Sequence, residues 1–72
     1  MEEIIVDIET EYIKLDSLLK LASIVDSGGI AKELILDGIV YVNGQQCTQR
    51  GKKIRPGDKV EIEDYLIVVR GD

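Results

Sequence analysis

The sequence has no histidine, tryptophan or phenylalanine, and it has a single cysteine, Cys47. Histidine is the commonest general base because its pKa is near neutral, so its absence weighs against acid–base catalysis. Structural zinc sites use cysteine and histidine, so zinc would need an unusual ligand set. One cysteine cannot close an internal disulfide, which is typical of a reducing cytosol. These absences predict a cytoplasmic protein that is not an enzyme and holds neither a metal nor a cofactor.

Long apolar runs are also absent. No stretch approaches the roughly 18 consecutive apolar residues of a membrane-spanning helix, and the acidic start, MEEIIVDIE, is unlike the basic start of a signal peptide. With 72 residues the chain has the size of one domain, and such a domain buries only about 60% of its unfolded surface. The sequence therefore predicts a single domain over residues 1–72, without membrane contact and with little room for a deep cleft.

The net charge of −5 is unevenly distributed. Residues 1–11 contain five acidic residues and no base, and residues 61–72 contain four acidic residues and one base. Residues 12–60 contain eight bases against five acids, and five of those bases lie between Arg50 and Lys59 with one acid. Because the local potential decides where a polyanion binds, the middle of the chain remains a candidate for binding nucleic acid despite the acidic total.

The segment LILDGIVYVNG, residues 34–44, joins a helix directly to a hairpin. Gly38 can take the left-handed conformation that ends a helix without a Cβ penalty. Asn43-Gly44 is the strongest short signal for a type I′ turn, in which both central residues have positive φ. The junction predicts a helix and a turn presented side by side to a partner, with no obvious place for a nucleophile or a metal.

Apolar periodicity predicts two helices. Leu15, Leu18, Leu19 and Ala22 have helical spacing, which indicates a helix over residues 15–24. A second helix follows the break at residues 26–29, with Ser27 as its N-cap. Its expected inner face is formed by Ile30 and Leu34, with Ala31 and Ile35 as further candidates. If the two helices pack antiparallel, lysines from both would flank the glycine turn.

The rest of the chain is predicted to be β. Alternation indicates a first strand over residues 3–8, and further strands are expected over residues 39–42, 45–48, 59–63 and 66–69. RPGD, residues 55–58, fits a type II turn, and Asp64-Tyr65 is the expected final turn. The first strand is expected to pair with the last. The fold class is α+β, with a helix pair packed on a small, mostly antiparallel sheet that has an added N-terminal strand.

Two segments have the chemistry to bind phosphate. Ser27-Gly28-Gly29 opens the second helix, where free amides and the positive end of the helix dipole favour an anion; the alternative is a flexible turn before a helix. Arg50, Lys52, Lys53, Arg55 and Lys59 are clustered as phosphate neutralisation requires; the alternative is a solvated hairpin loop.

Single residues add weaker candidates. Lys14, Lys20 and Lys32 either support the glycine turn or are ordinary surface lysines. Tyr41 should point outward, because Val40 and Val42 should face the core. An exposed aromatic ring beside bases can stack on an unpaired nucleobase, or it can pack on a neighbouring strand. Cys47 is expected to be a half-buried strand residue.

The ordered set of motifs resembles the S4 RNA-binding domain. The matching residues are Lys14-Leu15-Asp16 with Leu18-Leu19, Ser27 with Ala31 and Leu34-Ile35, Gly38, Val40, Val42-Asn43-Gly44 and Pro56-Gly57-Asp58. The match covers residues 14–62, the expected core. It is most similar to small stand-alone bacterial members of the family, which share the SGG-x-AK opening and an added N-terminal strand. The resemblance implies the two-helix αL motif and binding of structured RNA, often ribosomal, through the helix pair and the following turn.

By this resemblance the RNA face includes Lys14, Asp16, Ser27, Gly28, Lys32, Asn43 and Gly44. The chain departs from the family where Gly28 replaces an arginine and where Glu33 lies in a helix that is usually more basic. Either the amides of Gly28-Gly29 replace the missing arginine, or RNA affinity is lower; the hairpin bases are a further compensation. The complete set of predicted RNA-binding residues is Lys14, Asp16, Ser27, Gly28, Gly29, Lys32, Tyr41, Asn43, Gly44, Arg50, Lys52, Lys53 and Arg55.

The predicted function is non-catalytic binding of structured RNA, with ribosomal RNA or an assembling ribosomal subunit as the target and ribosomal proteins as further candidate partners. The expected state is a monomer. One alternative is a protein-binding adaptor that uses the acidic ends or a sheet edge. Another is a β-grasp sulfur carrier, which shares Val-Asn-Gly but ends in Gly-Gly, whereas this sequence ends Arg70-Gly71-Asp72.

Overall fold

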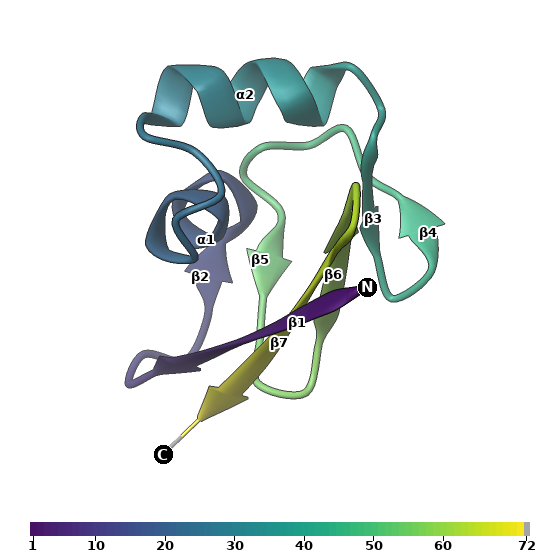
Figure 1. The fold of residues 1–72 in the computed structure, drawn as a ribbon. Coiled ribbons are helices and arrows are strands. Elements are labelled where there is room, and N and C mark those ends of the chain that lie inside the picture. Colours follow the sequence, from purple (N-terminus) through teal and green to yellow (C-terminus); the bar gives the residue numbers. More distant parts are fainter. Residues whose placement is uncertain (72) are drawn as a thin grey trace.

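The computed structural model describes residues 1–71, so Asp72, the last residue of the predicted domain, lies outside the described residues. Helices and strands follow one another as Figure 1 shows. The bounds are β1 Glu2–Ile8, β2 Ile13–Lys14, α1 Leu15–Leu21, α2 Gly28–Leu36, β3 Val40–Val42, β4 Gln45–Gln46, β5 Lys53–Ile54, β6 Lys59–Ile62 and β7 Tyr65–Gly71. The fold is the predicted α+β fold, a helix pair with a mostly antiparallel sheet and an N-terminal strand.

The larger sheet has the strand order β1-β7-β6-β3-β4. The terminal strands β1 and β7 pair in parallel, and the other neighbours are antiparallel. One row of register partners crosses the sheet through Ile4, Ile67, Val60 and Val42. Three of these side chains are buried and Ile4 packs against them, so alternation along the strands gives the sheet one apolar face.

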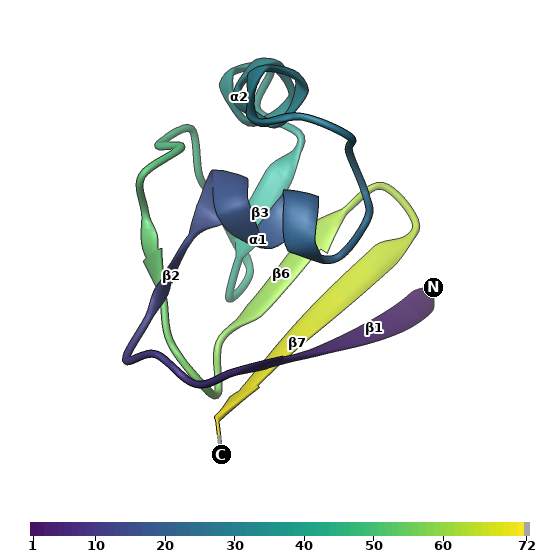
Figure 2. The same ribbon diagram turned by 90° about the vertical axis from the view of Figure 1, so that its left-hand side faces the viewer.

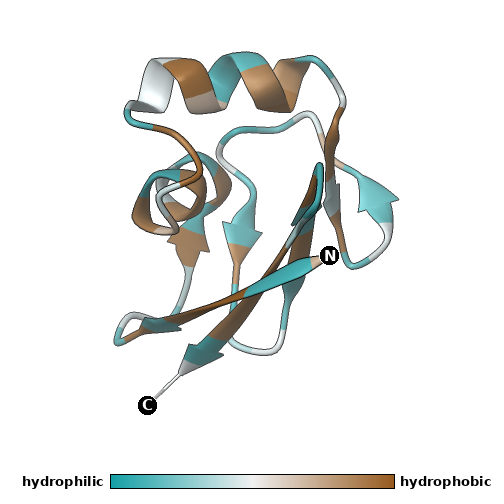
Figure 3. Ribbon diagram, viewed as in Figure 1, coloured by the Kyte–Doolittle hydropathy of each residue, from teal (hydrophilic) through white to brown (hydrophobic). Residues whose placement is uncertain are grey.

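That apolar face is covered by α1, which lies across the sheet in Figure 2, while α2 is seen end-on above it. Leu15, Leu18 and Leu19 of α1 are completely buried, as are Ala31 and Ile35 of α2. Figure 3 shows the hydrophobic residues gathered along α1, β3 and β7. The two helices cross, since α1 is seen end-on in Figure 1 and α2 is seen end-on in Figure 2. The antiparallel packing considered from the sequence is therefore wrong.

Both helices differ from prediction in one respect. Helix α1 ends at Leu21 rather than Ile24, because Ser23 takes a left-handed φ of 62°. The Ser23 and Ile24 amides then donate to the carbonyls of Lys20 and Leu19, at 3.0 Å each, which is a Schellman motif with serine in the glycine position. In α2, Ile30 is 45% exposed rather than on the inner face, because it lies in the first turn, before the buried Ala31 and Ile35.

A second, two-stranded sheet pairs β2 with β5, and the sequence did not predict it. Each strand has two residues, so alternation cannot be recognised. Ile13 lies opposite Ile54, whose side chain is completely buried. This small sheet fixes residues 53–54 of the basic segment beside the start of α1.

The turns agree with prediction in two places and differ in a third. Asn43 and Gly44 have φ of 51° and 84°, as the type I′ turn requires. Gly57 has φ of 97°, and the Asp58 amide donates to the Arg55 carbonyl at 3.0 Å, as in a type II turn. The last turn is Glu63-Asp64 instead of Asp64-Tyr65, because Tyr65 already pairs with Ile62 as a strand residue. Strand β4 is shorter than predicted and leaves the half-buried Cys47 just beyond it.

Candidate nucleic-acid interface

The pairing of β2 with β5 places Lys14 directly opposite Lys53. Both side chains are exposed, and opposite residues of an antiparallel pair point to the same side. Like charges in this position repel each other. The two lysines stay opposite each other because the backbones of β2 and β5 pair, and because Ile13 and Ile54 pack on the other side of this strand pair. The fold thus holds two lysines opposite each other with their side chains on the same side of the strand pair, where an anion between them would relieve the repulsion.

The start of α1 is tied to the basic segment by backbone hydrogen bonds. No side chain caps this helix. Instead the Leu15 amide donates to the Lys52 carbonyl at 2.9 Å, and the Asp16 amide donates to the Arg50 carbonyl at 3.1 Å. These bonds satisfy amides that a helix start otherwise leaves free. They also fix Arg50 and Lys52 against Lys14, although 36 or more residues separate them in the sequence.

A tyrosine that sequence reasoning missed lies among these bases. The Lys53 Nζ is 5.0 Å from the centre of the Tyr12 ring, and the Arg55 Cζ is 5.9 Å from it. A cation over an aromatic face is attracted by the ring quadrupole. The half-buried Tyr12 therefore orders both cations. Nothing in the sequence signals this role, because Tyr12 reaches the bases only through the β2–β5 pair.

We call the group formed by Lys14, Arg50, Lys52, Lys53 and Arg55 the basic edge. All five side chains are exposed. Within residues 1–71 the one ion pair joins Asp7 to Arg70, so no member of the basic edge is neutralised by a carboxylate. Asp16 is close in sequence, but its Oδ1 accepts a hydrogen bond from its neighbouring Ser17 amide at 2.7 Å. The basic edge is thus a positive surface on an acidic protein.

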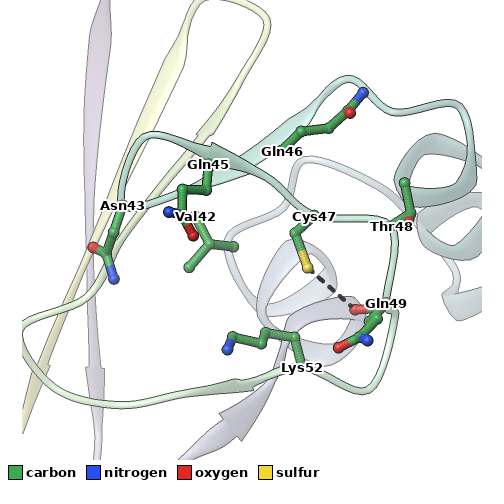
Figure 4. A pocket seen from close by; sticks show the side chains of 8 residues that line it. All are labelled: Val42, Asn43, Gln45, Gln46, Cys47, Thr48, Gln49 and Lys52. Carbon is green, nitrogen blue, oxygen red and sulfur yellow. Dashed lines mark hydrogen bonds between the residues drawn. The ribbon is translucent and has the colours of Figure 1, made fainter.

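An open hollow of about 520 Å³ adjoins the basic edge at Lys52. Figure 4 shows the Lys52 and Gln49 side chains below Cys47, with Gln46 directed away from them. Amide side chains can donate and accept, so they suit the edges of nucleobases. The residues that line it are Val42, Asn43, Gln45, Gln46, Cys47, Thr48, Gln49 and Lys52.

The side chain of Asn43, which together with Gly44 was predicted to contact RNA, has a clear internal role. The Asn43 Nδ2 donates to the Asp58 Oδ1 at 3.0 Å, and its Oδ1 accepts from the Lys59 amide at 3.0 Å. The second carboxylate oxygen of Asp58 accepts from the Arg55 amide at 2.8 Å. This network joins the Asn-Gly turn to the PGD turn. Both polar ends of the Asn43 side chain are therefore used inside the protein.

The start of α2 forms a second predicted group, on a different element from the basic edge. Ser27 is the N-cap, as predicted, and its Oγ accepts from the Ile30 amide at 3.3 Å. No atom lies within 4 Å of a Cβ built on Gly28, and only the Ser27 Oγ, at 3.9 Å, lies near one built on Gly29. Packing therefore does not require glycine at either position. Lys32 is exposed one turn further along.

Tyr41 is exposed, as predicted, but its neighbours are not bases. It lies opposite Gln46 on one side and Glu61 on the other. It also lines a hollow of about 360 Å³ with Gly38, Ile39, Glu61 and Glu63. The expectation of a tyrosine beside basic residues is wrong for Tyr41, because the pairing of β3 with β6 places Glu61 opposite it. Tyr12 is the tyrosine that the structure places beside them.

Within residues 1–71, none of the helices has the length and apolar character that a membrane span requires. No group of three or more histidine, cysteine, aspartate or glutamate side chains in that part of the chain is arranged to hold a metal ion.

Comparison with known proteins adds two findings. Residues 6–70 match the family model of the S4 domain. The chain is also 43% identical over 60 residues to a Bacillus subtilis (strain 168) protein described as "Probable ribosome maturation protein RlbA". That alignment covers 83% of this chain and 84% of the relative. The family match over residues 6–70 contains both helices and the strands β2 and β5, so it includes the whole basic edge.

Proposed function

The chain belongs to the S4 domain family, and on that premise we propose that it binds structured RNA, with ribosomal RNA or an assembling ribosomal subunit as its target. The relative's description as a ribosome maturation protein supports the choice of target. We further propose that it acts in the cytoplasm, as a single domain and a monomer, without catalysis. RNA binding and the proposed absence of catalysis are consistent, since binding RNA needs neither a nucleophile nor a metal.

The observation that carries the proposal is the pairing of Lys14 with Lys53 at the centre of the basic edge. Each phosphate that a lysine or arginine neutralises releases counterions, which favours binding and makes it depend on salt. The backbone bonds from Leu15 and Asp16 fix the main chain at Lys52 and Arg50 before RNA binds. The Tyr12 ring lies against the cations of Lys53 and Arg55. A preordered set of cations loses less entropy on binding than flexible ones.

In the proposed mode the basic edge holds RNA phosphates while the amide-lined hollow next to Lys52 faces the bases. The free amides at Gly28 and Gly29 and the ammonium of Lys32 provide a second phosphate contact from α2. Asn43, which lines this hollow, and Gly44 act in this mode through the shape of their turn, which the bonds of the Asn43 side chain to Asp58 and Lys59 hold in place. Shape and charge, rather than base sequence, would thus dominate recognition.

The test is co-sedimentation with purified bacterial ribosomal particles at several salt concentrations, with and without ribonuclease. The double variant Lys52→Glu, Lys53→Glu reverses two charges of the basic edge. We expect it to weaken association and to reduce the slope of log K against log salt by about 1.5, since each lost phosphate contact removes about 0.7–0.9.

The matched control is Lys20→Glu, Lys59→Glu, which makes the same charge change at exposed positions outside the basic edge. Its salt slope should stay close to that of the unmodified protein. Equal loss in both variants would show that total charge, rather than the basic edge, controls association. Binding that survives ribonuclease and does not respond to either variant would favour a protein-binding adaptor instead.

A further inference from the structure

No helix or strand within residues 1–71 covers the face of the large sheet that lies away from the helices. Side chains on this side come from alternate residues, and the register places Ile5 beside Val68 and Leu66 beside Glu61. Tyr41 follows Glu61 on the next strand. Figure 2 shows both helices on the opposite side of the sheet. We call this surface, formed by Ile5, Tyr41, Glu61, Leu66 and Val68, the open face.

The centre of the open face is apolar. Ile5 is 50% exposed and Tyr41 is 42% exposed, while Leu66 and Val68 are half-buried between them. Single exposed apolar residues are ordinary, but Ile5, Leu66 and Val68 lie on the adjacent strands β1 and β7 and form a continuous patch. Tyr41 lies beyond Glu61 of β6, on the far side of that residue from Leu66. Three of the four apolar residues belong to the terminal strand pair β1–β7. The patch is thus placed on the most extended part of the sheet.

Carboxylates lie beside Leu66 and Tyr41 on the open face. Glu3 lies beside Leu66, Glu61 beside Tyr41, and Glu63 shares the hollow with Tyr41. Two bases are on the same face, but Arg70 is already paired with Asp7, which leaves Lys59 opposite Val68. The open face is therefore apolar with an acidic rim, whereas the basic edge has the opposite charge.

The charge determines what can cover the open face. RNA phosphates would be repelled by Glu3, Glu61 and Glu63. A second copy of this chain placed face to face would bring the same acids together, because a two-fold interface matches a surface with itself. A basic segment with apolar side chains satisfies both the patch and the rim. The tyrosine ring and two carboxylates of the smaller hollow match an arginine or lysine side chain.

We propose that the open face binds a basic, partly apolar segment of a protein partner, while the basic edge remains free for a polyanion. The surface differs from the proposed RNA interface in its residues, its elements and the sign of its charge. Binding at the open face and RNA binding at the basic edge can therefore be tested separately.

The test is a nuclear magnetic resonance titration of the ¹⁵N-labelled chain with a ten-residue peptide of alternating arginine and leucine. We expect saturable shifts at Ile5, Tyr41, Glu61, Leu66 and Val68, with the basic edge unchanged. A peptide of alternating glutamate and leucine is the control for apolar contact alone, and it should leave these signals in place. Shifts spread over other surfaces, or equal binding of the acidic peptide, would overturn the proposal.

Variants make the test specific to the rim. Glu61→Lys with Glu63→Lys should weaken binding of the basic peptide by about tenfold, because the partner's charges then meet like charges. Glu9→Lys with Glu11→Lys makes the same charge change in an exposed segment outside the open face and should leave affinity unchanged. Tyr41→Ser, which keeps every rim charge, should also weaken binding if the ring contacts the cation.

Two outcomes would reject the proposal in different ways. Equal affinity in the rim variant and its control would show that the acidic rim does not select the partner. Signals of the open face that move with protein concentration in the absence of peptide would show that a second copy covers it. Co-sedimentation of the rim variant with ribosomal particles, which should persist, separates this surface from the basic edge.

Discussion

Gly38 and Gly44 have almost the same backbone conformation but different surroundings. Their φ values are 80° and 84°. A Cβ on Gly44 would have no atom within 4 Å, whereas one on Gly38 would lie 2.5 Å from the Gln46 Nε2. That amide donates to the Gly38 carbonyl at 2.8 Å. An alanine at position 44 would therefore add backbone strain alone. An alanine at position 38 would add the same strain and would also displace the hydrogen-bonded Gln46 side chain.

We expect Gly44→Ala to lower the free energy of unfolding by about 1 kcal/mol, the cost of a left-handed alanine. Gly38→Ala should cost about 1 kcal/mol more, because the Gln46 hydrogen bond is lost as well. Urea unfolding of the two variants gives the comparison. In a Gln46→Ala background the difference should disappear, and a difference that persists would mean that another contact restricts Gly38.

The residue types predicted the local backbone conformation better than they predicted which residues contact each other in the fold. The Asn-Gly and Pro-Gly turns were predictable because positive φ selects those residues locally. Tyr41 and Tyr12 are both tyrosines near strands, and only the pairing of distant strands decides which one meets Lys53 and Arg55. The bonds of Asn43 to Asp58 and Lys59 likewise depend on a contact between two turns.

At the scale of elements, variants of Ser27 at the start of α2 can separate its structural role as the N-cap from a role in RNA binding. Ser27→Ala removes the acceptor for the Ile30 amide and should lower the free energy of unfolding by about 1 kcal/mol. Ser27→Asp keeps a capping oxygen and should retain most of the stability. Thermal unfolding of both variants measures this difference.

RNA binding by the same two variants tests the second phosphate contact. A carboxylate at position 27 lies beside the free amides of Gly28 and Gly29 and would repel phosphate. We expect Ser27→Asp to bind ribosomal particles less tightly than Ser27→Ala, although it is the more stable of the two. Equal binding would restrict the RNA interface to the basic edge and assign Ser27 a capping role alone.

Elements with a clear period were predictable, and those without one were not. The strand over residues 3–8 and the helix containing Leu15, Leu18 and Leu19 follow from alternation and helical spacing. Strands β2 and β5 have two residues each and show no period. The crossing of the helices depends on how side chains pack between them. Since β2 and β5 assemble the basic edge, the candidate site was only partly predictable, as a list of bases without their arrangement.

At the scale of the whole molecule, the Asp7–Arg70 pair links the strands at the two ends of the chain. The Arg70 Nε and Nη2 donate to the two Asp7 carboxylate oxygens at 2.8 and 3.0 Å. This hydrogen bonding, assisted by the charge of Arg70, holds the pKa of Asp7 below its ordinary value of 3.8. A lowered pKa means that the folded state favours the ionised carboxylate. Its contribution to stability is therefore present above pH 3.8 and lost as the pH falls through the lower, folded-state value.

We expect Asp7→Asn to reduce the free energy of unfolding slightly near pH 7, and the difference from the unmodified protein to vanish in strong acid. Both side chains are 57% exposed, so high salt should weaken the effect. Urea unfolding at about pH 7 and about pH 2 measures it. Glu9→Gln removes a charge without an ion pair and serves as the control; an equal effect there would assign the loss to net charge.

The molecule as a whole separates its charges, with the basic edge around the β2–β5 pair and the acidic rim on the open face of the sheet. The total of −5 conceals this arrangement. The uneven distribution along the chain predicted a basic middle, but the sequence could not show which surface each charge would occupy. The two proposed surfaces depend on that separation, and each has its own charge-reversal test.

The parallel pairing of β1 with β7 also has a consequence for the order in which the chain can fold. Asp7 and Arg70 are 63 positions apart, so this pair closes a loop that contains most of the protein, and closing a long loop costs entropy before its contacts form. During synthesis β1 is made first and remains without its neighbour until the last strand has been translated. The acidic residues Glu2, Glu3 and Asp7 of β1 would help to prevent the unpaired strand from pairing with other chains.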